Sequence, residues 1–261
     1  MNKPVNKDGT VGKALEILDL VAGLGRPVRF TELLTLSPHP KATLYRFLQT
    51  LVNQGMLTYD DERQTYNLGL RLVRMAHAAW AQSSLAPVAR RHLDSFAAET
   101  GETLHLAQMD NGQVLYVDKR NAAQPVEMFA AAGKVGPAYC TGVGKAIMAY
   151  MDDTRLEQAL RHQSYHRYTE HTLTSKEALL AELQEIREEG ISFDREEHEP
   201  GIICIAAPIT SSGSRVIGAL SLTTTTARHS LSDLMGFRPR LLECVAAIGE
   251  EASAWQFPVQ T

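Results

Sequence analysis

The pattern of apolar and polar positions is most regular in residues 40–53. The apolar side chains there have the i, i+3, i+4, i+7, i+8 spacing of one helix face: Leu44, Phe47, Leu48, Leu51 and Val52. Such a period predicts a helix that packs one face inward. The other face carries side chains that can contact phosphates and base edges, namely His39, Lys41, Tyr45, Arg46, Gln49 and Asn53.

Short elements flank this helix on both sides. Residues 32–36 predict a shorter helix with Thr31 as its cap, and Gly55 can adopt the positive φ that commonly follows a helix end. Two apolar runs, 56–59 and 65–68, enclose a polar loop and predict a β-hairpin. This order indicates a winged helix-turn-helix that reads DNA. A helical core with a solvated face is the alternative, but it does not account for the hairpin.

Further helices are predicted on either side of this module. Residues 10–24 have one apolar face, and residues 69–82 carry a broad apolar stripe. The same helix of a second subunit is the simplest partner for that stripe, although an ordinary core helix would show the same period.

A second domain is expected to begin after Ser83, Ser84 and Pro87. Asn111-Gly112 predicts a type I′ turn between two strands. The mixture of strands and helices predicts an α+β domain with a central antiparallel sheet. Its other expected elements are a strand at 126–130, a helix from Gly142, a helix opened by the capping box Thr174–Glu177 and stopped by Gly190, strands at 202–209 and 216–223, and a last helix ending near Trp255.

Charge is distributed unevenly along the 261 residues. The formal net charge is −4, yet residues 1–83 hold ten Lys/Arg and seven Asp/Glu, whereas residues 84–261 hold sixteen and twenty-three. The resulting balances, +3 and −7, place a polyanionic partner at the N-terminal end. No apolar run approaches the roughly 18 residues of a membrane span, and the polar start is unlike a signal peptide. A cytoplasmic protein without a membrane partner is expected.

Several segments of the second domain predict a ligand site. A helix opened by small residues offers free N–H groups and a positive dipole end to a carboxylate. Leu104 and Leu106 are expected to supply an apolar wall. The candidate ligand contacts are Thr141, Gly142 and Val143 at the helix start, Asp194 before a charged run, Cys204 in an apolar strand, and Ser221 and Thr223 on one strand face.

The sequence gives little support for a metal site or for covalent catalysis. His162, His166 and His171 lack a carboxylate partner at a familiar spacing, so we expect no metal and no cofactor. A cysteine-dependent enzyme, with Cys140 or Cys204 as nucleophile, is the rival class of function. No catalytic residue is predicted, because nothing pairs these cysteines with a base and an apolar strand disfavours a thiolate.

Residues 10–255 resemble the IclR family of bacterial transcription regulators. The segments that carry the resemblance are PKATLYRFLQTL, YNLGLRL, TGVGKAIMA and GISFDREEHEPGIICIAAPI. The resemblance implies a winged helix-turn-helix DNA-binding domain over 8–68, a linker and dimerisation helix over 69–84, and a GAF-like α+β effector-binding domain over 85–258. It also implies a homodimer or tetramer on a near-palindromic site in double-stranded DNA.

The resemblance assigns residues to two sites. The effector is expected to be a small carboxylic acid, either a sugar acid or a 2-oxo or hydroxy acid, and the protein a repressor of a catabolic operon. An aromatic acid is the alternative, since Val143 and Ile202 could line an apolar slot. The expected DNA contacts are His39, Lys41, Thr43, Tyr45, Arg46, Gln49 and Arg63, and the expected effector contacts are Thr141, Gly142, Val143, Asp194, Cys204, Ser221 and Thr223.

The sequence departs from the family pattern in the turn and in the pocket. Pro38 and His39 stand where the family has Gly and Leu, and Ala42 stands where a serine often contacts phosphate. A stiffer turn and one phosphate contact fewer are expected, while His39 could add a contact. Val143 is larger than the residue often found there, which leaves the pocket size open.

Overall fold

The computed structural model describes residues 9–211 and 215–253, without the side chains of 81–83. Contacts divide the chain into two compact units, Met1–Ala81 and Gln82–Thr261. The division lies within helix α4 (Leu70–Ser83), which joins the units in sequence. No helix of the described residues is long and apolar enough to cross a membrane.

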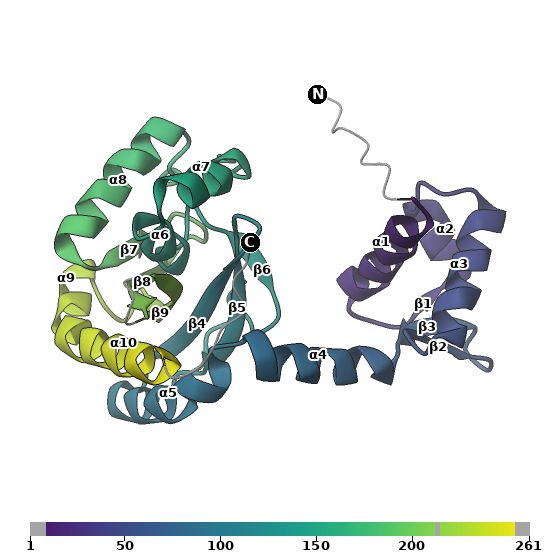
Figure 1. Ribbon diagram of the computed structural model, residues 1–261, viewed down its shortest axis with the longest axis horizontal. Helices are drawn as coiled ribbons and strands as arrows, with labels where there is room; N and C mark the ends of the chain where they lie inside the picture. Colours follow the sequence, from purple (N-terminus) through teal and green to yellow (C-terminus); the bar gives the residue numbers. More distant parts are fainter. Residues whose placement is uncertain (1–8, 212–214, 254–261) are drawn as a thin grey trace. The chain divides into compact units, whose positions relative to one another are not determined.

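The N-terminal unit is the predicted helix-turn-helix with a small sheet (Figure 1). Its sheet has the strand order β1-β3-β2, and Leu57 pairs with Leu68 across the β2–β3 hairpin. The apolar face of α3 is buried as predicted, and Gly55 has a φ of +67°. The elements are α1 (Gly9–Leu24), β1 (Val28–Arg29), α2 (Phe30–Leu36), α3 (Lys41–Asn53), β2 (Leu57–Asp60) and β3 (Thr65–Leu68).

The predicted cap of α2 is wrong. The helix begins at Phe30, so Thr31 lies in its first turn and not before it, and the preceding Arg29 makes no side-chain cap hydrogen bond. The cause is the short strand β1, which sequence reasoning missed. Because Val28 and Arg29 pair with β3, the chain passes directly from a strand into the helix.

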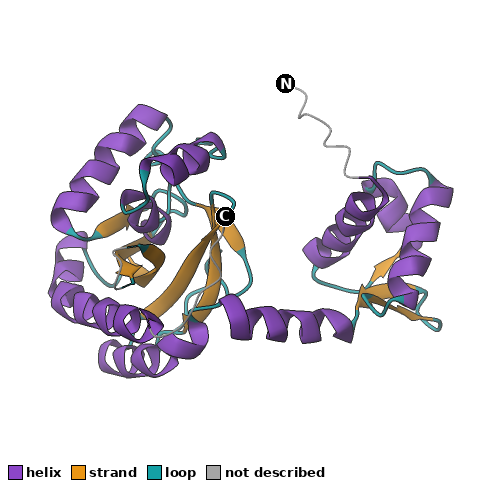
Figure 2. Cartoon of the chain, in the orientation of Figure 1, coloured by secondary structure: helices purple, strands orange, loops and turns teal. Residues whose placement is uncertain are grey.

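The C-terminal unit has the predicted α+β fold with an antiparallel sheet (Figure 2). Its strand order is β6-β5-β4-β9-β8-β7, with α6 packed on one face and α5 and α10 on the other. The elements are α5 (Ala86–Thr100), β4 (Thr103–Asp110), β5 (Gln113–Arg120), β6 (Val135–Pro137), α6 (Gly142–Ala149), α7 (Asp153–Arg161), α8 (Lys176–Glu189), β7 (Ser192–Arg195), β8 (Ile202–Thr210), β9 (Val216–Thr225), α9 (Leu231–Leu234), a 3₁₀ turn (Met235–Phe237) and α10 (Arg238–Ser253).

The strand predicted at 126–130 is wrong. This segment is irregular, and the third strand of the meander forms later, at β6. The backbone N–H of Phe129 donates to both carboxylate oxygens of Glu199, at 2.9 and 3.1 Å. The Phe129 N–H is therefore paired with a side chain distant in sequence and not with the backbone of a neighbouring strand.

Turn chemistry in this unit largely follows the prediction. Asn111 and Gly112 have φ values of +48° and +79°, as a type I′ turn requires, and Gly190 ends α8 with a φ of +77°. The capping box is misplaced by one residue, because Ser175 and not Thr174 accepts the N–H of Ala178 at 3.1 Å. The end predicted near Trp255 lies outside the described residues.

Candidate functional site

The exposed face of α3 presents the side chains predicted to contact DNA. Lys41, Tyr45 and Arg46 are exposed, while Thr43 and Gln49 are half-buried at its margin. The buried stripe fixes which way the helix is rotated, so this polar face is turned to solvent. Such a face can supply phosphate contacts from its cations and base contacts from its other polar groups.

His39 lies differently from the other DNA-contact candidates. Its side chain is only 12% exposed, and its Nε2 is 3.2 Å from Oε2 of Glu16 on α1. The ring also lies beside Phe47, with 6.3 Å between ring centroids. A contact between the imidazole and DNA would therefore require the ring to leave Glu16.

The β2–β3 loop presents Arg63 at the wing. Oδ1 of Asp60 accepts the N–H groups of Glu62 and Arg63, both at 3.0 Å. Gln64 completes the turn with a φ of +55°. The carboxylate thus orders the loop backbone and leaves the Arg63 side chain exposed.

Strand register gathers the polar residues of the second unit on one face of its sheet. Asp194 pairs with Cys204, Cys204 pairs with Thr223, and Ser221 pairs with His105. Opposite residues in an antiparallel sheet point to the same side, as do residues two apart in one strand. All five side chains therefore share a face, and α6 packs over that face.

A β-bulge adds an aromatic ring to this face. Leu106 pairs with Asp118 but Ala107 pairs with Tyr116, so Val117 is the extra residue of β5. The bulge changes the alternation of the strand and turns Tyr116 toward the polar face. Its ring meets the ring of His105 edge-on, with 5.5 Å between centroids.

Close packing presses the start of α6 against β8. A Cβ on Gly142 would lie 2.5 Å from Sγ of Cys204, and one on Gly144 would lie 2.3 Å from the carbonyl oxygen of Ala138. Only glycine fits at either position. Thr141 precedes the helix, and its hydroxyl donates to the carbonyl of Pro137 at 2.8 Å. The first-turn N–H groups, which have no partner within a helix, thus come next to the polar face.

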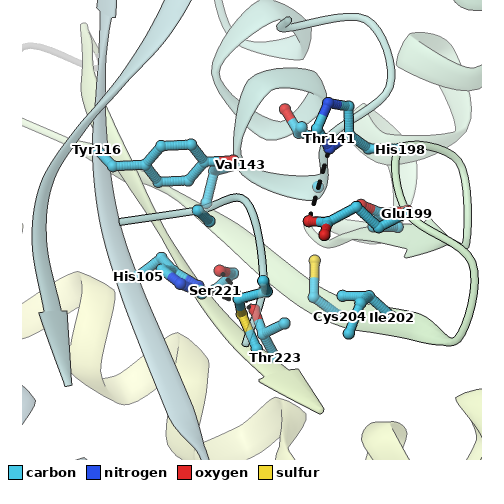
Figure 3. Close-up of a pocket in the computed structure, with 14 residues that line it drawn as sticks. His105, Tyr116, Thr141, Val143, His198, Glu199, Ile202, Cys204, Ser221 and Thr223 are labelled. Carbon is cyan, nitrogen blue, oxygen red and sulfur yellow. Dashed lines mark hydrogen bonds and ion pairs between the residues drawn. The ribbon is translucent and has the colours of Figure 1, made fainter. Parts of the chain in front are cut away.

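These elements line a small pocket (Figure 3). All seven predicted effector residues line it: Thr141, Gly142, Val143, Asp194, Cys204, Ser221 and Thr223. Ile202 also lines it, as the aromatic-acid alternative assumed. Sequence reasoning missed the other lining residues, which are His105, Tyr116, Met128, Ala130, His198 and Glu199.

The predicted apolar wall is wrong. Leu104 and Leu106 pair with Leu222 and Leu220 on β9 and face away from the pocket, whereas His105 between them faces it. The sequence shows that side chains at 104, 105 and 106 alternate between the two faces of the strand. It does not show which of the two faces lines the pocket.

Charge in the pocket centres on Asp194. Burial, and then the charge of Glu197, raise the pKa of its carboxyl to about 7. The group is therefore partly protonated near neutral pH and can donate a hydrogen bond as well as accept one. Oδ1 of Asp194 also accepts the N–H of Glu197 at 2.8 Å.

Lys145 lies on α6, two residues after Val143 of the pocket lining, and is fully buried. Its Nζ is 3.0 Å from Oε1 of Glu182 on α8 and also contacts the carboxylate of Glu197. Burial opposes the ammonium charge, but the charges of Glu197 and Glu182 outweigh it and raise the pKa of Lys145. This network links α6 to α8 and to the segment after β7.

The cysteines and histidines show no catalytic arrangement in the described residues. Burial raises the pKa of Cys140 and of Cys204 well above the usual thiol range, so neither is an available thiolate at neutral pH. His162, His166 and His171 are exposed. No group of three or more His, Cys, Asp or Glu side chains in the described part of the chain is arranged to hold a metal ion.

A winged helix-turn-helix joined in one chain to a domain whose pocket is lined by both polar and apolar groups defines a ligand-responsive DNA-binding protein. Residues 77–250 match the family model described as bacterial transcriptional regulator IclR C-terminal, and residues 10–61 match the IclR helix-turn-helix domain. The chain belongs to the IclR family of transcriptional regulators, which are not enzymes.

Relatives cover nearly the whole chain. The HTH-type transcriptional regulators XynR and KdgR of Escherichia coli K12 are each 32% identical, over 92% and 95% of this chain and 95% of their own lengths. The crystal structure of an IclR regulator from Alicyclobacillus acidocaldarius has a TM-score of 0.78 at 27% identity, covering 94% of this chain and 98% of that one.

A further structure shares the fold and contains a bound ligand. It is an IclR homolog from Microbacterium hydrocarbonoxydans complexed with 4-hydroxybenzoate. The TM-score is 0.80 at 21% identity, covering 94% of this chain and 100% of that one. At that identity the likeness extends to the fold alone.

Proposed function

We propose that a small carboxylic acid, bound in the pocket, controls the affinity of this regulator for a near-palindromic operator. The observation that carries this proposal is the start of α6, whose first-turn N–H groups have no partner within the helix and lie over a buried polar face. A carboxylate at this position would be held by backbone donors and by the positive end of the helix dipole. The regulator would act as a repressor of a catabolic operon. Because its target is chromosomal DNA, it would act in the cytoplasm.

The rest of the lining favours a hydroxylated acid, such as a sugar acid or a 2-oxo or hydroxy acid. Ser221 and Thr223 offer hydroxyls 3.3 Å apart, and the partly protonated Asp194 can both donate and accept. Such groups suit ligand hydroxyls, which also do both. An aromatic acid is the second candidate, because Tyr116, Val143 and Ile202 provide apolar surface and a homolog binds 4-hydroxybenzoate.

The apolar stripe of α4 supports a homodimer or tetramer. Leu70, Val73 and Met75 are each more than half exposed, which is unusual for large apolar side chains on one helix. The same helix of a second copy would cover them and bring two copies of α3 to one palindromic site. Replacing Val73 with Glu should therefore lower the molar mass measured by light scattering to that of a smaller assembly.

DNA binding is tested by replacing Arg46 with Ala. Its exposed guanidinium on α3 is available to a phosphate, so the variant should lose the gel shift of an operator selected from random DNA. Arg161→Ala, an exposed arginine of the other unit, is the matched control and should bind normally. Unchanged operator affinity in Arg46→Ala would mean that this arginine has no part in the interface.

Ligand binding is tested by thermal shift with a panel of carboxylic acids. A stabilising acid should lose its effect in Asp194→Ala, while the exposed Asp153→Ala should keep it. Thermal melts of the same variants without acid, together with their operator binding, show whether both units still fold. Stabilisation that persists in Asp194→Ala would place the acid elsewhere.

A further inference from the structure

His105 carries a buried ring nitrogen without a hydrogen-bond partner among the described residues. Its side chain is 1% exposed and lines the pocket. Nδ1 lies 3.1 Å from Oγ1 of Thr223, whereas Nε2 has no partner. Leaving a buried polar atom unpaired is costly and uncommon in folded proteins. The free nitrogen therefore indicates where a polar group of the ligand would bind.

The imidazole is neutral in the folded protein. Burial, and then the charge of Lys119, lower the pKa of His105 to about 3. The backbone carbonyl of Ala130, which also accepts a hydrogen bond from Nζ of Lys119 at 3.1 Å, acts in the opposite direction and raises that pKa. A neutral ring can either donate or accept at Nε2, depending on its tautomer.

The hydroxyl groups next to Nδ1 of His105 are compatible with either tautomer of the ring. Oγ of Ser221 is 3.3 Å from Oγ1 of Thr223, which in turn is 3.1 Å from Nδ1 of His105. Each hydroxyl can reverse its donor and acceptor roles, so Nε2 can match either role of its partner. A ligand hydroxyl, itself both donor and acceptor, is the group best suited to this position.

His105 also lies away from the expected carboxylate seat. The close approach of Gly142 to Cys204 places the start of α6 over β8, whereas His105 is on β4. Because the strand order is β8-β9-β4, the two lie two strand spacings apart, about 10 Å at the backbone. Figure 3 shows His105 beside Ser221 and Thr223, across the pocket from His198 and Glu199.

We propose that Nε2 of His105 binds a hydroxyl group carried on the part of the ligand remote from its carboxylate. The pocket then selects hydroxylated acids over acids of the same skeleton that lack the hydroxyl. This inference rests on the proposed function, since it assumes a carboxylate at the start of α6. It adds the residue that distinguishes one acid from another.

The test uses three pairs of acids that differ in their hydroxyl groups: gluconate and hexanoate, 4-hydroxybutanoate and butanoate, and 4-hydroxybenzoate and benzoate. Calorimetry gives the dissociation constants for the full-length wild type, for His105→Phe, which keeps a ring without nitrogen, and for His105→Gln, which restores a polar group. His171→Phe, at an exposed histidine, is the control. Operator binding and thermal melts verify that each variant folds.

In the wild type, at least one hydroxylated acid should bind about tenfold tighter than its partner, because the partner leaves Nε2 unpaired. His105→Phe should remove most of this ratio, His105→Gln should restore part of it, and the control should keep it. If His105→Phe does not fold, the test rests on His105→Gln, whose ratio of the two dissociation constants must then differ from that of the wild type.

Two results would overturn the inference. One is a hydroxyl preference that both His105 variants retain; the other is failure of all six acids to bind the wild type. Neither decides the proposed function, because acid binding that depends on Asp194 and operator binding that depends on Arg46 are measured separately.

Discussion

Replacing the buried Lys145 with Met should lower the free energy of unfolding of the C-terminal unit by about 3–5 kcal/mol, the usual result of removing one partner from a buried ion pair. Methionine fills nearly the same volume, so the loss is electrostatic and not a cavity effect. Glu197 is 2% exposed and would lose its ion-pair partner. Glu182 would keep Arg195, 2.7 Å away, and contributes less to the loss.

Matched variants separate the effect of burial from the loss of a lysine. Lys176 pairs with Glu157 at 2.9 Å in the same unit, but both side chains are more than 40% exposed. Lys176→Met should change stability far less, because solvent already screens that pair. Adding Glu197→Gln to Lys145→Met removes the stranded carboxylate and should recover part of the loss.

The assay is chemical denaturation of the full-length protein, followed by circular dichroism. Because two units can unfold in separate transitions, hydrogen exchange of the α6 and α8 amides assigns the change to the C-terminal unit. A loss below about 1 kcal/mol, the range of exposed pairs, would refute the reasoning. So would a double variant no more stable than Lys145→Met.

Three further predictions concern the pocket. Gly142→Ala should abolish acid binding in calorimetry but keep operator binding, since its Cβ would lie 2.5 Å from Sγ of Cys204; normal acid affinity would contradict this packing. Affinity for a carboxylate should fall as pH rises through about 7, where Asp194 ionises and repels it, and Asp194→Asn should flatten the profile measured from pH 6 to 8. Glu199→Gln should speed hydrogen exchange at the Phe129 amide, which donates to that carboxylate, and unchanged exchange would show that other contacts hold the segment.

Sequence predicted the local conformations best. Gly55, Asn111, Gly112 and Gly190 adopt positive φ as expected, because the backbone requirement and the residue that meets it lie at one position. Helix caps were less predictable where two neighbouring residues could each accept the capping hydrogen bond. Thr174 and Ser175 can both accept a capping hydrogen bond, and in the structure Ser175 does so.

The pocket depends on register, which one sequence does not reveal. The spacing of Ser221 and Thr223 places them on one strand face, but the pairing of Ser221 with His105 unites two distant segments. Alternation in β4 is equally compatible with either side facing the ligand, and the bulge at Val117 that turns Tyr116 inward has no obvious signal. The partner of Phe129, a glutamate seventy positions away, is equally hidden.

Asp194, Glu197 and Lys145 form one electrostatic group, although only Asp194 lines the pocket. The charge of Glu197 raises the pKa of Asp194, and the charge of Lys145 lowers it. Lys145→Met removes the cation that favours ionised Asp194, so the pH above which carboxylate binding weakens should move upward. Glu197→Gln removes the anion and should move that pH downward. Calorimetry across the same pH range measures both shifts, and an unmoved midpoint in both variants would mean that neither charge sets the proton affinity of Asp194.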